Sequence, residues 1–410
     1  MSEPNVNRHA LAFIFITMLV DTIGLGIIIP VTPKLITELT GEGMSEAARW
    51  GGWLFFVFAL MQFFCAPAIG NLSDRFGRRP VLIASLAMLG VDYLITALAP
   101  TIFWLFVGRF LSGIAGAAYP TANAYIADVS PPEKRAANFG LVGAAFGIGF
   151  VIGPAIGGVL GQYGSRLPFY VSAGIAFCNA LYGFLVLKES LAPANRRKFE
   201  LWRANPLGAL VALRRFPAML GLFGVIVLMR LAHDANPVIW TYYTMLKFSW
   251  SPAQVGYSLM VVGAMLAFVF SFVTRIVVPR IGEVRSVYLG LACGTIGFMG
   301  YAFATHGWVL YSWMAVWVLM GLSGPSLNAI MSKQVGPAEQ GELQGALASL
   351  GSLTSVAAPP ILSNLFGYFT SGSAPVYFPG SAFFAASLCL ALSALVFAWA
   401  RRVPQQSHAS

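Results

Sequence analysis

Long apolar runs separated by short polar stretches dominate the chain. Each run holds about 20 residues or more, the length that a helix needs to cross a hydrocarbon core of about 30 Å. We expect twelve such runs, over residues 10–33, 50–70, 80–100, 101–127, 137–162, 168–188, 217–246, 252–278, 285–305, 307–332, 343–369 and 379–400. All are predicted to be helices, because an open strand edge cannot find hydrogen-bond partners in lipid. The pattern predicts an all-α membrane protein with twelve transmembrane helices.

Composition and charge placement agree with this topology. Charged residues make up 10% of the 410 residues, against about 25% in soluble domains. The net charge of +10 does not indicate a nucleic-acid partner, because its distribution has another explanation. Nineteen of the 25 lysines and arginines fall in loops on one predicted side of the membrane, and only four fall on the other. By the positive-inside rule, both termini are expected to be cytoplasmic. The four cysteines lie inside apolar runs, so we expect packing roles and neither a disulfide nor a metal site.

The two halves of the chain resemble each other. When the first half is shifted by 205 residues, Gly116 falls on Gly321, Pro132 on Pro337 and Gly140 on Gly345. The repeat predicts two pseudo-symmetric six-helix bundles, 1–188 and 217–410, joined by a charged cytoplasmic linker at 189–216. Such repeats are typical of transporters with a substrate site between the halves.

A short charged loop follows the second run. It contains one acid and three arginines and includes the candidate residues Gly70, Asp74, Arg75, Gly77, Arg78 and Arg79. These residues could form a salt-bridge cluster that latches one conformation. The simpler interpretation is a loop that only fixes topology.

The loop pattern G-x-L-x-D-R-x-G-R-R resembles the signature loop of the major facilitator superfamily. The fifth run carries a second pattern, Gly149, Gly153, Pro154, Gly157 and Gly158, similar to the motif of the family's proton-coupled drug exporters. Its simpler interpretation is close packing of small residues. The resemblance implies the major facilitator fold and an export direction. It also implies that Asp128, at the end of the fourth run, joins the charged loop, where we expect it to pair with Arg75 or Arg78.

Charges inside the apolar runs are costly and indicate function by default. Asp21, Asp92 and Arg109 are expected at comparable depth in the first half. They could form a proton switch, in which an acid alternates between an arginine partner and an apolar environment; the alternative is a static ion pair. In the seventh run, Arg230 and Asp234 are spaced to pair on one helix face, or they could join His233 in a substrate or proton site.

A finer resemblance points to the tetracycline-efflux group. The stretch from Asp21 to Pro33 and the pair Asp92-Tyr93 are similar to motifs of that group, which implies that Asp21, Asp92 and Arg109 are its proton or substrate residues. The chain departs from the group in the second half. Gly294 stands where the group has an acid, Leu266 where it has a histidine, and Arg230 where it has a neutral residue.

Polar and aromatic side chains within the runs could line a substrate cavity. The candidates are Gln62, Tyr119, Asn123, Arg230, His233, Asp234, Trp240 and Asn328. For any one of them, packing or interfacial anchoring is the simpler interpretation.

The function that we predict is secondary active transport, in which a proton-coupled antiporter exports an amphipathic, tetracycline-like or other drug molecule. It would need no cofactor beyond the proton gradient, and its partners would be a small molecule, protons and the lipid bilayer, with the chain working as a monomer in a bacterial inner membrane. A carrier for a sugar or other metabolite is the alternative. A receptor or intramembrane enzyme is disfavoured, because the sequence has no large soluble domain and no catalytic motif.

Overall fold

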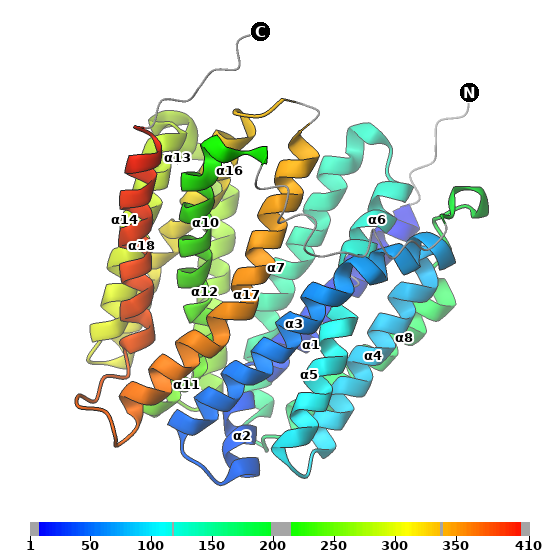
Figure 1. The fold of residues 1–410 in the computed structure, drawn as a ribbon. Coiled ribbons are helices and arrows are strands. Elements are labelled where there is room, and N and C mark those ends of the chain that lie inside the picture. Colours follow the sequence, from blue (N-terminus) through cyan, green and yellow to red (C-terminus); the bar gives the residue numbers. More distant parts are fainter. Residues whose placement is uncertain (1–7, 117–118, 198–214, 337–338, 403–410) are drawn as a thin grey trace. The chain divides into compact units, whose positions relative to one another are not determined.

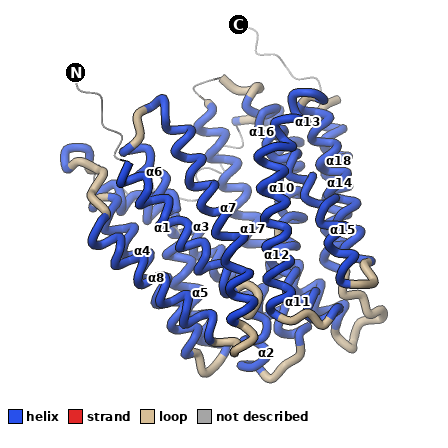
Figure 2. The backbone as a smooth tube through the Cα atoms, turned by 180° about the vertical axis from the view of Figure 1, so that it is seen from behind, coloured by secondary structure: helices blue, strands red, loops and turns tan. Residues whose placement is uncertain are grey.

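The computed structural model describes residues 8–116, 119–197, 215–336 and 339–402, and these residues form helices and loops without any strand (Figure 1, Figure 2). Among these described residues, twelve helical segments are long and apolar enough to span a membrane, which agrees with the predicted number. The first six spans are α1 (Arg8–Ile28), α3 (Met44–Phe76), α4 (Arg78–Leu98), α5 with α6 (Ile102–Gly116 and Tyr119–Val129), α7 (Arg135–Leu160) and α8 (Leu167–Val186). Short elements between them are α2 (Thr32–Thr40), η1 (Pro132–Lys134) and η2 (Pro193–Asn195).

Three of the remaining six spans are interrupted, which the apolar pattern did not predict. The six are α10 with α11 (Leu220–His233 and Ala235–Phe248), α12 with the π-helix η6 and α13 (Pro252–Phe268, Val269–Val273 and Thr274–Ile281), α14 (Glu283–Phe303), α15 with the 3₁₀ turn η7 and α16 (Gly307–Trp317, Val318–Leu322 and Ser323–Ser332), α17 (Gln340–Thr370) and α18 (Ser381–Ala400). The turn η5 (Pro217–Met219) precedes them. Hydropathy does not register such breaks, because a helix that changes its hydrogen-bond pattern stays equally apolar.

The chain divides into two compact units. The first contains Met1–Gly43, Val57–Asn205 and Trp250–Val261, and the second contains Met44–Phe56, Pro206–Ser249 and Val262–Ser410. The beginning of α3 therefore belongs to the second unit, and the beginning of α12 to the first. The division into bundles 1–188 and 217–410 stays a prediction, and residues 198–214 of the linker lie outside the described residues.

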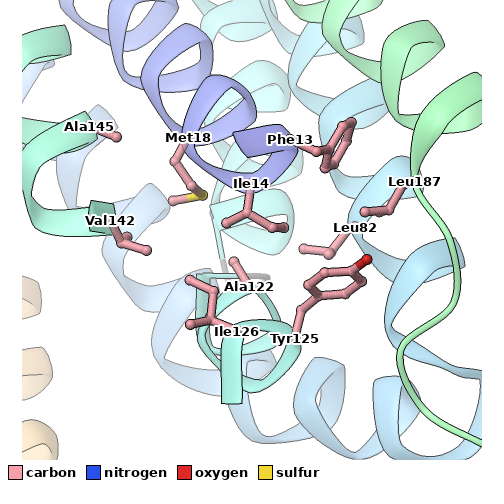
Figure 3. Close-up of a cluster of buried hydrophobic side chains, with 10 residues drawn as sticks. All are labelled: Phe13, Ile14, Met18, Leu82, Ala122, Tyr125, Ile126, Val142, Ala145 and Leu187. Atoms are coloured by element: carbon pink, nitrogen blue, oxygen red, sulfur yellow. The ribbon is translucent and has the colours of Figure 1, made fainter. Parts of the chain in front are cut away.

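Within the first unit, α1 packs closely on α7 and α8, and α4 packs on α5 and α8. One end of this packing is a buried apolar cluster that joins α1, α4, α6 and α7 (Figure 3). Its members are Phe13, Ile14, Met18, Leu82, Ala122, Tyr125, Ile126, Val142, Ala145 and Leu187. The Tyr125 hydroxyl donates a hydrogen bond to the Lys188 carbonyl at 2.9 Å. The cluster thereby fixes the chain directly after α8.

Within the second unit, α18 packs on α10 and α14 around aromatic side chains. The Phe383 ring lies 4.9 Å from the Tyr243 ring and 5.5 Å from the Tyr301 ring, centroid to centroid. The Tyr243 hydroxyl donates a short hydrogen bond to the Tyr301 carbonyl. These edge-on contacts bury large apolar surfaces and satisfy a polar atom inside the span.

Candidate functional site

An ion pair lies inside the membrane spans of the first unit. Asp92 on α4 is fully buried, and its Oδ2 lies 3.3 Å from Nη2 of Arg109 on α5. The Thr96 hydroxyl donates to Asp92 Oδ1 at 3.3 Å. Gly108 permits this approach, because a Cβ at that position would lie 2.3 Å from Asp92 Oδ1. Two of the three predicted proton residues are therefore in contact.

Asp21, the third predicted proton residue, stands apart from this pair. It is half-buried on α1 and forms no ion pair with any residue that the structure describes. One turn along α1, Gly24 contacts the Tyr93 ring, which follows Asp92 in the chain. The Tyr93 hydroxyl is buried without a hydrogen-bond partner among the described residues. Within the described part of the chain, Asp21 thus has no ion-pair partner and the Tyr93 hydroxyl has no hydrogen-bond partner.

The junction of α3 and α4 forms the predicted salt-bridge cluster, with Arg78 at its centre. Most residues of the predicted loop are helical, because α3 continues to Phe76 and only Gly77 separates it from α4. Arg78 Nη1 lies 2.5 Å from Asp74 Oδ1, and Arg78 Nε lies 3.4 Å from Asp128 Oδ2. The Arg78 guanidinium also donates to the Ser73 hydroxyl at 2.6 Å. Of the two partners expected for Asp128, Arg78 is the one that pairs with it. One cation thereby links three separate positions at the ends of α3, α4 and α6.

The remaining candidates of this loop have local contacts. The Arg75 guanidinium lies 5.0 Å from the centroid of the Phe76 ring. Arg79 donates to the Phe184 carbonyl at 2.7 Å, which ties α4 to α8. A Cβ at Gly70 would meet no atom within 4 Å, so no neighbour in this structure requires glycine there. Their role in a conformational latch stays a prediction.

Glu189, which the sequence analysis missed, caps the beginning of α4. Its carboxylate accepts hydrogen bonds from the backbone N–H groups of Arg78 at 2.9 Å and Arg79 at 3.3 Å. A carboxylate is favoured at the positive end of a helix dipole. Gly77, with a φ of +104°, leaves room for it, because a Cβ there would lie 2.1 Å from Glu189 Oε2. The available signal was an acid directly after the sixth apolar run, but its partners lie more than 100 residues earlier in the chain.

The glycines of the fifth-run motif face two different helices. Positions 149, 153 and 157 of α7 lie against α1, where a Cβ on Gly157 would come within 1.9 Å of the Ile27 carbonyl oxygen. Gly158 faces the beginning of α12, where a Cβ would lie 2.6 Å from the Pro252 carbonyl oxygen. Pro154 contacts Gly26 of α1 and lies inside α7. The motif provides close backbone packing, and its meaning for export stays a prediction.

The second unit contains a cavity of about 450 Å³. Three of the predicted substrate residues, Arg230, His233 and Asn328, line it. Gln344 and Leu266 line it as well, although the sequence analysis did not propose them as cavity residues. The local ion pair considered for Arg230 and Asp234 is not formed, although the Asp234 N–H still donates a helical hydrogen bond to the Arg230 carbonyl at 3.0 Å.

The other predicted substrate residues lie elsewhere. Asp234 does not line the cavity, and one of its carboxylate oxygens is buried without a hydrogen-bond partner among the described residues. Trp240 is buried against Tyr301, with ring centroids 5.2 Å apart. In the first unit, Gln62 donates to the Gly116 carbonyl at 3.2 Å, and Asn123 is half-buried on α6. The side chain of Tyr119 lies outside the described residues.

Gly294, where the tetracycline-efflux group has an acid, occupies a tightly packed part of α14. A Cβ at this position would lie 2.7 Å from Leu390 Cδ1 and 3.1 Å from Met320. An aspartate at this position would require the Leu390 and Met320 side chains to move aside.

Together, twelve membrane spans, a buried intramembrane ion pair and a salt-bridged loop define a polytopic transporter of the major facilitator class. The Major Facilitator Superfamily model matches residues 14–359, and the chain belongs to that family. It is 38% identical over 360 residues to the class C tetracycline resistance protein of Escherichia coli, covering 88% of this chain and 90% of the relative. The class G protein of Vibrio anguillarum is 39% identical over 349 residues, covering 83% and 86%. Multidrug resistance protein 2 of Bacillus subtilis is 27% identical over 89% of this chain and 91% of its own length.

Solved structures share the fold at lower identity. The human organic anion transporter MFSD10 superposes with a TM-score of 0.69 at 21% identity, covering 96% of this chain and all of that one. A bacterial homolog of the human lysosomal transporter Spinster, in an inward-facing and unoccupied conformation, gives a TM-score of 0.78 at 16% identity over 98% of both chains. These likenesses confirm the predicted fold class.

Proposed function

We propose that this chain is a proton-coupled antiporter that exports an amphipathic drug molecule, tetracycline or a related compound. The observation that carries the proposal is the ion pair between Asp92 and Arg109, buried inside the membrane spans of a chain with tetracycline-resistance relatives. Because those relatives are named for drug resistance, a drug is favoured over a sugar or other metabolite. We further propose a bacterial inner-membrane location, cytoplasmic termini and a monomeric state.

The ion pair suggests how proton binding could change the transporter. A proton that binds the Asp92 carboxylate neutralises it and removes its attraction for Arg109. The freed arginine can then separate from α4, and loss of the proton restores the pair. Because Asp21 lacks an ion-pair partner among the described residues, it is a second acid that could hold or pass on the proton. Protein motion that exposes the pair to opposite sides in turn would couple proton entry to drug exit.

Proteoliposomes containing the full chain test this proposal. Vesicles with an acidic lumen should accumulate tetracycline, and their lumen should become less acidic as tetracycline enters. Both signals should disappear with Asp92→Asn and persist with Arg275→Gln, which removes an exposed charge of α13 far from the ion pair in sequence. Tetracycline uptake that ignores the pH gradient would overturn proton coupling, and the absence of any drug-dependent signal across a panel of drugs would overturn drug export.

A further inference from the structure

The cavity of the second unit lies where three membrane spans lose regular α-helical structure. Arg230 and His233 are in the last turn of α10, directly before the break at Asp234. Phe270 comes from the π-helix η6, and Gly321 from the 3₁₀ turn η7. Such irregular turns inside helices are frequent at functional sites, and broken spans at a binding site are a recurrent design in transporters. The concentration of three breaks around one cavity indicates a binding site.

Arg230 gives this cavity its charge. None of the seventeen lining residues is an aspartate or glutamate, and Arg230 is the one lining residue that is always charged. Within the part of the chain that the structure describes, Arg230 forms no ion pair with any carboxylate. Its side chain is exposed, and its Nε lies 3.9 Å from the Cβ position of Gly351 on α17. Charged side chains in membrane spans pair with one another or with backbone carbonyls, or they face a water-filled cavity. Arg230 lines the cavity, whereas Asp234 does not, so an anionic group of a ligand could reach the guanidinium there.

The rest of the lining suits a flat apolar body with a few polar groups. Trp317 stacks on His233, with ring centroids 6.1 Å apart and an interplanar angle of 19°. Phe270 and Leu266 contribute apolar surface, and the amides of Asn328 and Gln344 add hydrogen-bonding groups. A volume of about 450 Å³ is within the range of drug-sized sites.

We infer that this cavity binds an amphipathic organic anion, an aromatic molecule whose carboxylate or sulfonate pairs with Arg230. The inference rests on the proposed export function and narrows its substrate class. A guanidinium presents paired N–H groups that match the two oxygens of a carboxylate. A cationic drug of the same shape would be repelled by Arg230, and no acid of the lining would compensate.

Two dyes with the same xanthene framework and opposite charge test the charge preference. The purified full chain in detergent is titrated against fluorescein, an anion, and rhodamine 123, a cation, and binding is followed by fluorescence anisotropy with empty micelles as blank. We expect fluorescein to bind at least about tenfold more tightly, since one favourable charge contact is worth that much. Equal binding of the two dyes, or tighter binding of rhodamine 123, would overturn the inference without requiring any variant to fold.

The variant Arg230→Gln tests whether the preference for the anionic dye arises from Arg230 in the cavity. It should weaken fluorescein binding about tenfold and remove the difference between the dyes. The matched control is Arg275→Gln, which removes an exposed arginine of the same unit that does not line the cavity and should leave both affinities unchanged. Thermal unfolding in detergent identifies any misfolded variant. A folded Arg230→Gln protein that still prefers fluorescein would contradict the inference.

The charge inference and the export proposal can fail separately. If proton-driven uptake is found for cationic drugs while fluorescein does not bind, export is supported and the charge inference is wrong. If fluorescein binds through Arg230 but no compound crosses proteoliposomes in response to a pH gradient, the binding site is supported and proton-coupled export is wrong.

Discussion

The loop after the second membrane span and the loop after the eighth share one backbone but differ in their charges. At an offset of 205 residues, Gly77 corresponds to Gly282, and each separates two helices with a positive φ, 104° and 82° respectively. A backbone of this kind is essentially restricted to glycine. The turn that joins consecutive spans has therefore been kept in both halves of the chain.

The same offset relates two ion pairs of opposite polarity. Arg78 pairs with Asp128 at 3.4 Å in the first unit, and Glu283 pairs with Lys333 at 2.6 Å in the second. Acid and base have exchanged places while the contact between the two spans has remained. The two halves therefore keep the contact between equivalent positions. The sign of each charge can change as long as the two charges of the pair remain opposite.

The two loops differ in what surrounds the glycine. Glu189 lies against Gly77, whereas a Cβ at Gly282 would meet nothing within 4 Å. Asp74, the second acid that pairs with Arg78, has Pro279 at the equivalent position. At the first loop, several charged residues therefore form a connected network around Arg78. At the second loop, the described residues show the ion pair between Glu283 and Lys333. Substitutions at equivalent positions can show whether this difference has a functional consequence.

The largest effect is expected where the first half has an ion pair inside its membrane spans and the equivalent positions of the second half carry no charge. Asp92 and Arg109 correspond to Gly297 and Met314. Asp92→Asn should lower the free energy of unfolding by about 3–5 kcal/mol, because it leaves the Arg109 cation unpaired inside the span. Chemical unfolding in mixed micelles measures this change, and proteoliposome assays should show no proton-driven uptake.

The double variant Asp92→Asn with Arg109→Met separates the contribution of the ion pair to stability from its role in proton-driven uptake. Removing both charges should restore most of the stability, because no unpaired ion remains. Proton-driven uptake should stay absent. A double variant that transports like the unmodified protein would reduce the pair to a packing element, equivalent to the apolar contact of the second half.

The next largest effect compares the two glycines directly. Gly282→Ala should cost about 1–3 kcal/mol from backbone strain alone. Gly77→Ala should cost more, because the new methyl group would also displace the Glu189 carboxylate from the beginning of α4. Unfolding of both variants under the same conditions measures the difference. Equal losses would mean that Glu189 moves aside without cost.

A smaller effect is expected from removal of the cap itself. Glu189→Ala leaves the first backbone N–H groups of α4 without their acceptor, and losing such a cap costs about 0.5–2 kcal/mol. The matched control is Glu133→Ala, which removes an exposed acid of η1 and should leave stability unchanged. If both variants unfold alike, the difference between the two loops does not depend on Glu189.

The membrane spans and some contacts between charged side chains at their ends could be predicted from the sequence. The number of membrane spans follows from hydropathy. The family resemblance led us to expect Asp128 to pair with Arg75 or Arg78, and only the structure selects Arg78. Glu189 could not be assigned, because its partners are backbone N–H groups, which leave no trace in the amino-acid pattern.

The interruptions of the helical spans in the second half could not be predicted from the apolar pattern either. A π-turn or a 3₁₀ turn changes hydrogen bonding without changing side chains, so the residues of η6 and η7 are as apolar as their neighbours. The break after His233 had one visible signal in the sequence. Pro237, four residues after His233, cannot donate a helical hydrogen bond to the His233 carbonyl. Arg230 and His233 were identified as unusual charges, but that they share a cavity depends on these breaks.

The smallest effect is expected at the charge-reversed pair of the second half. Lys333→Gln should cost at most about 0.5 kcal/mol, because the Lys333 side chain is 68% exposed and surface pairs contribute little. Arg78→Gln should cost clearly more, since that guanidinium is 11% exposed and also binds Asp74 and Ser73. Unfolding of the two variants side by side measures the gap. If Lys333→Gln lowers the free energy of unfolding as much as Arg78→Gln does, the pair with Glu283 contributes as much stability as the contacts of Arg78. The two halves would then differ in the sign of their charges but not in how strongly the ends of their spans are joined.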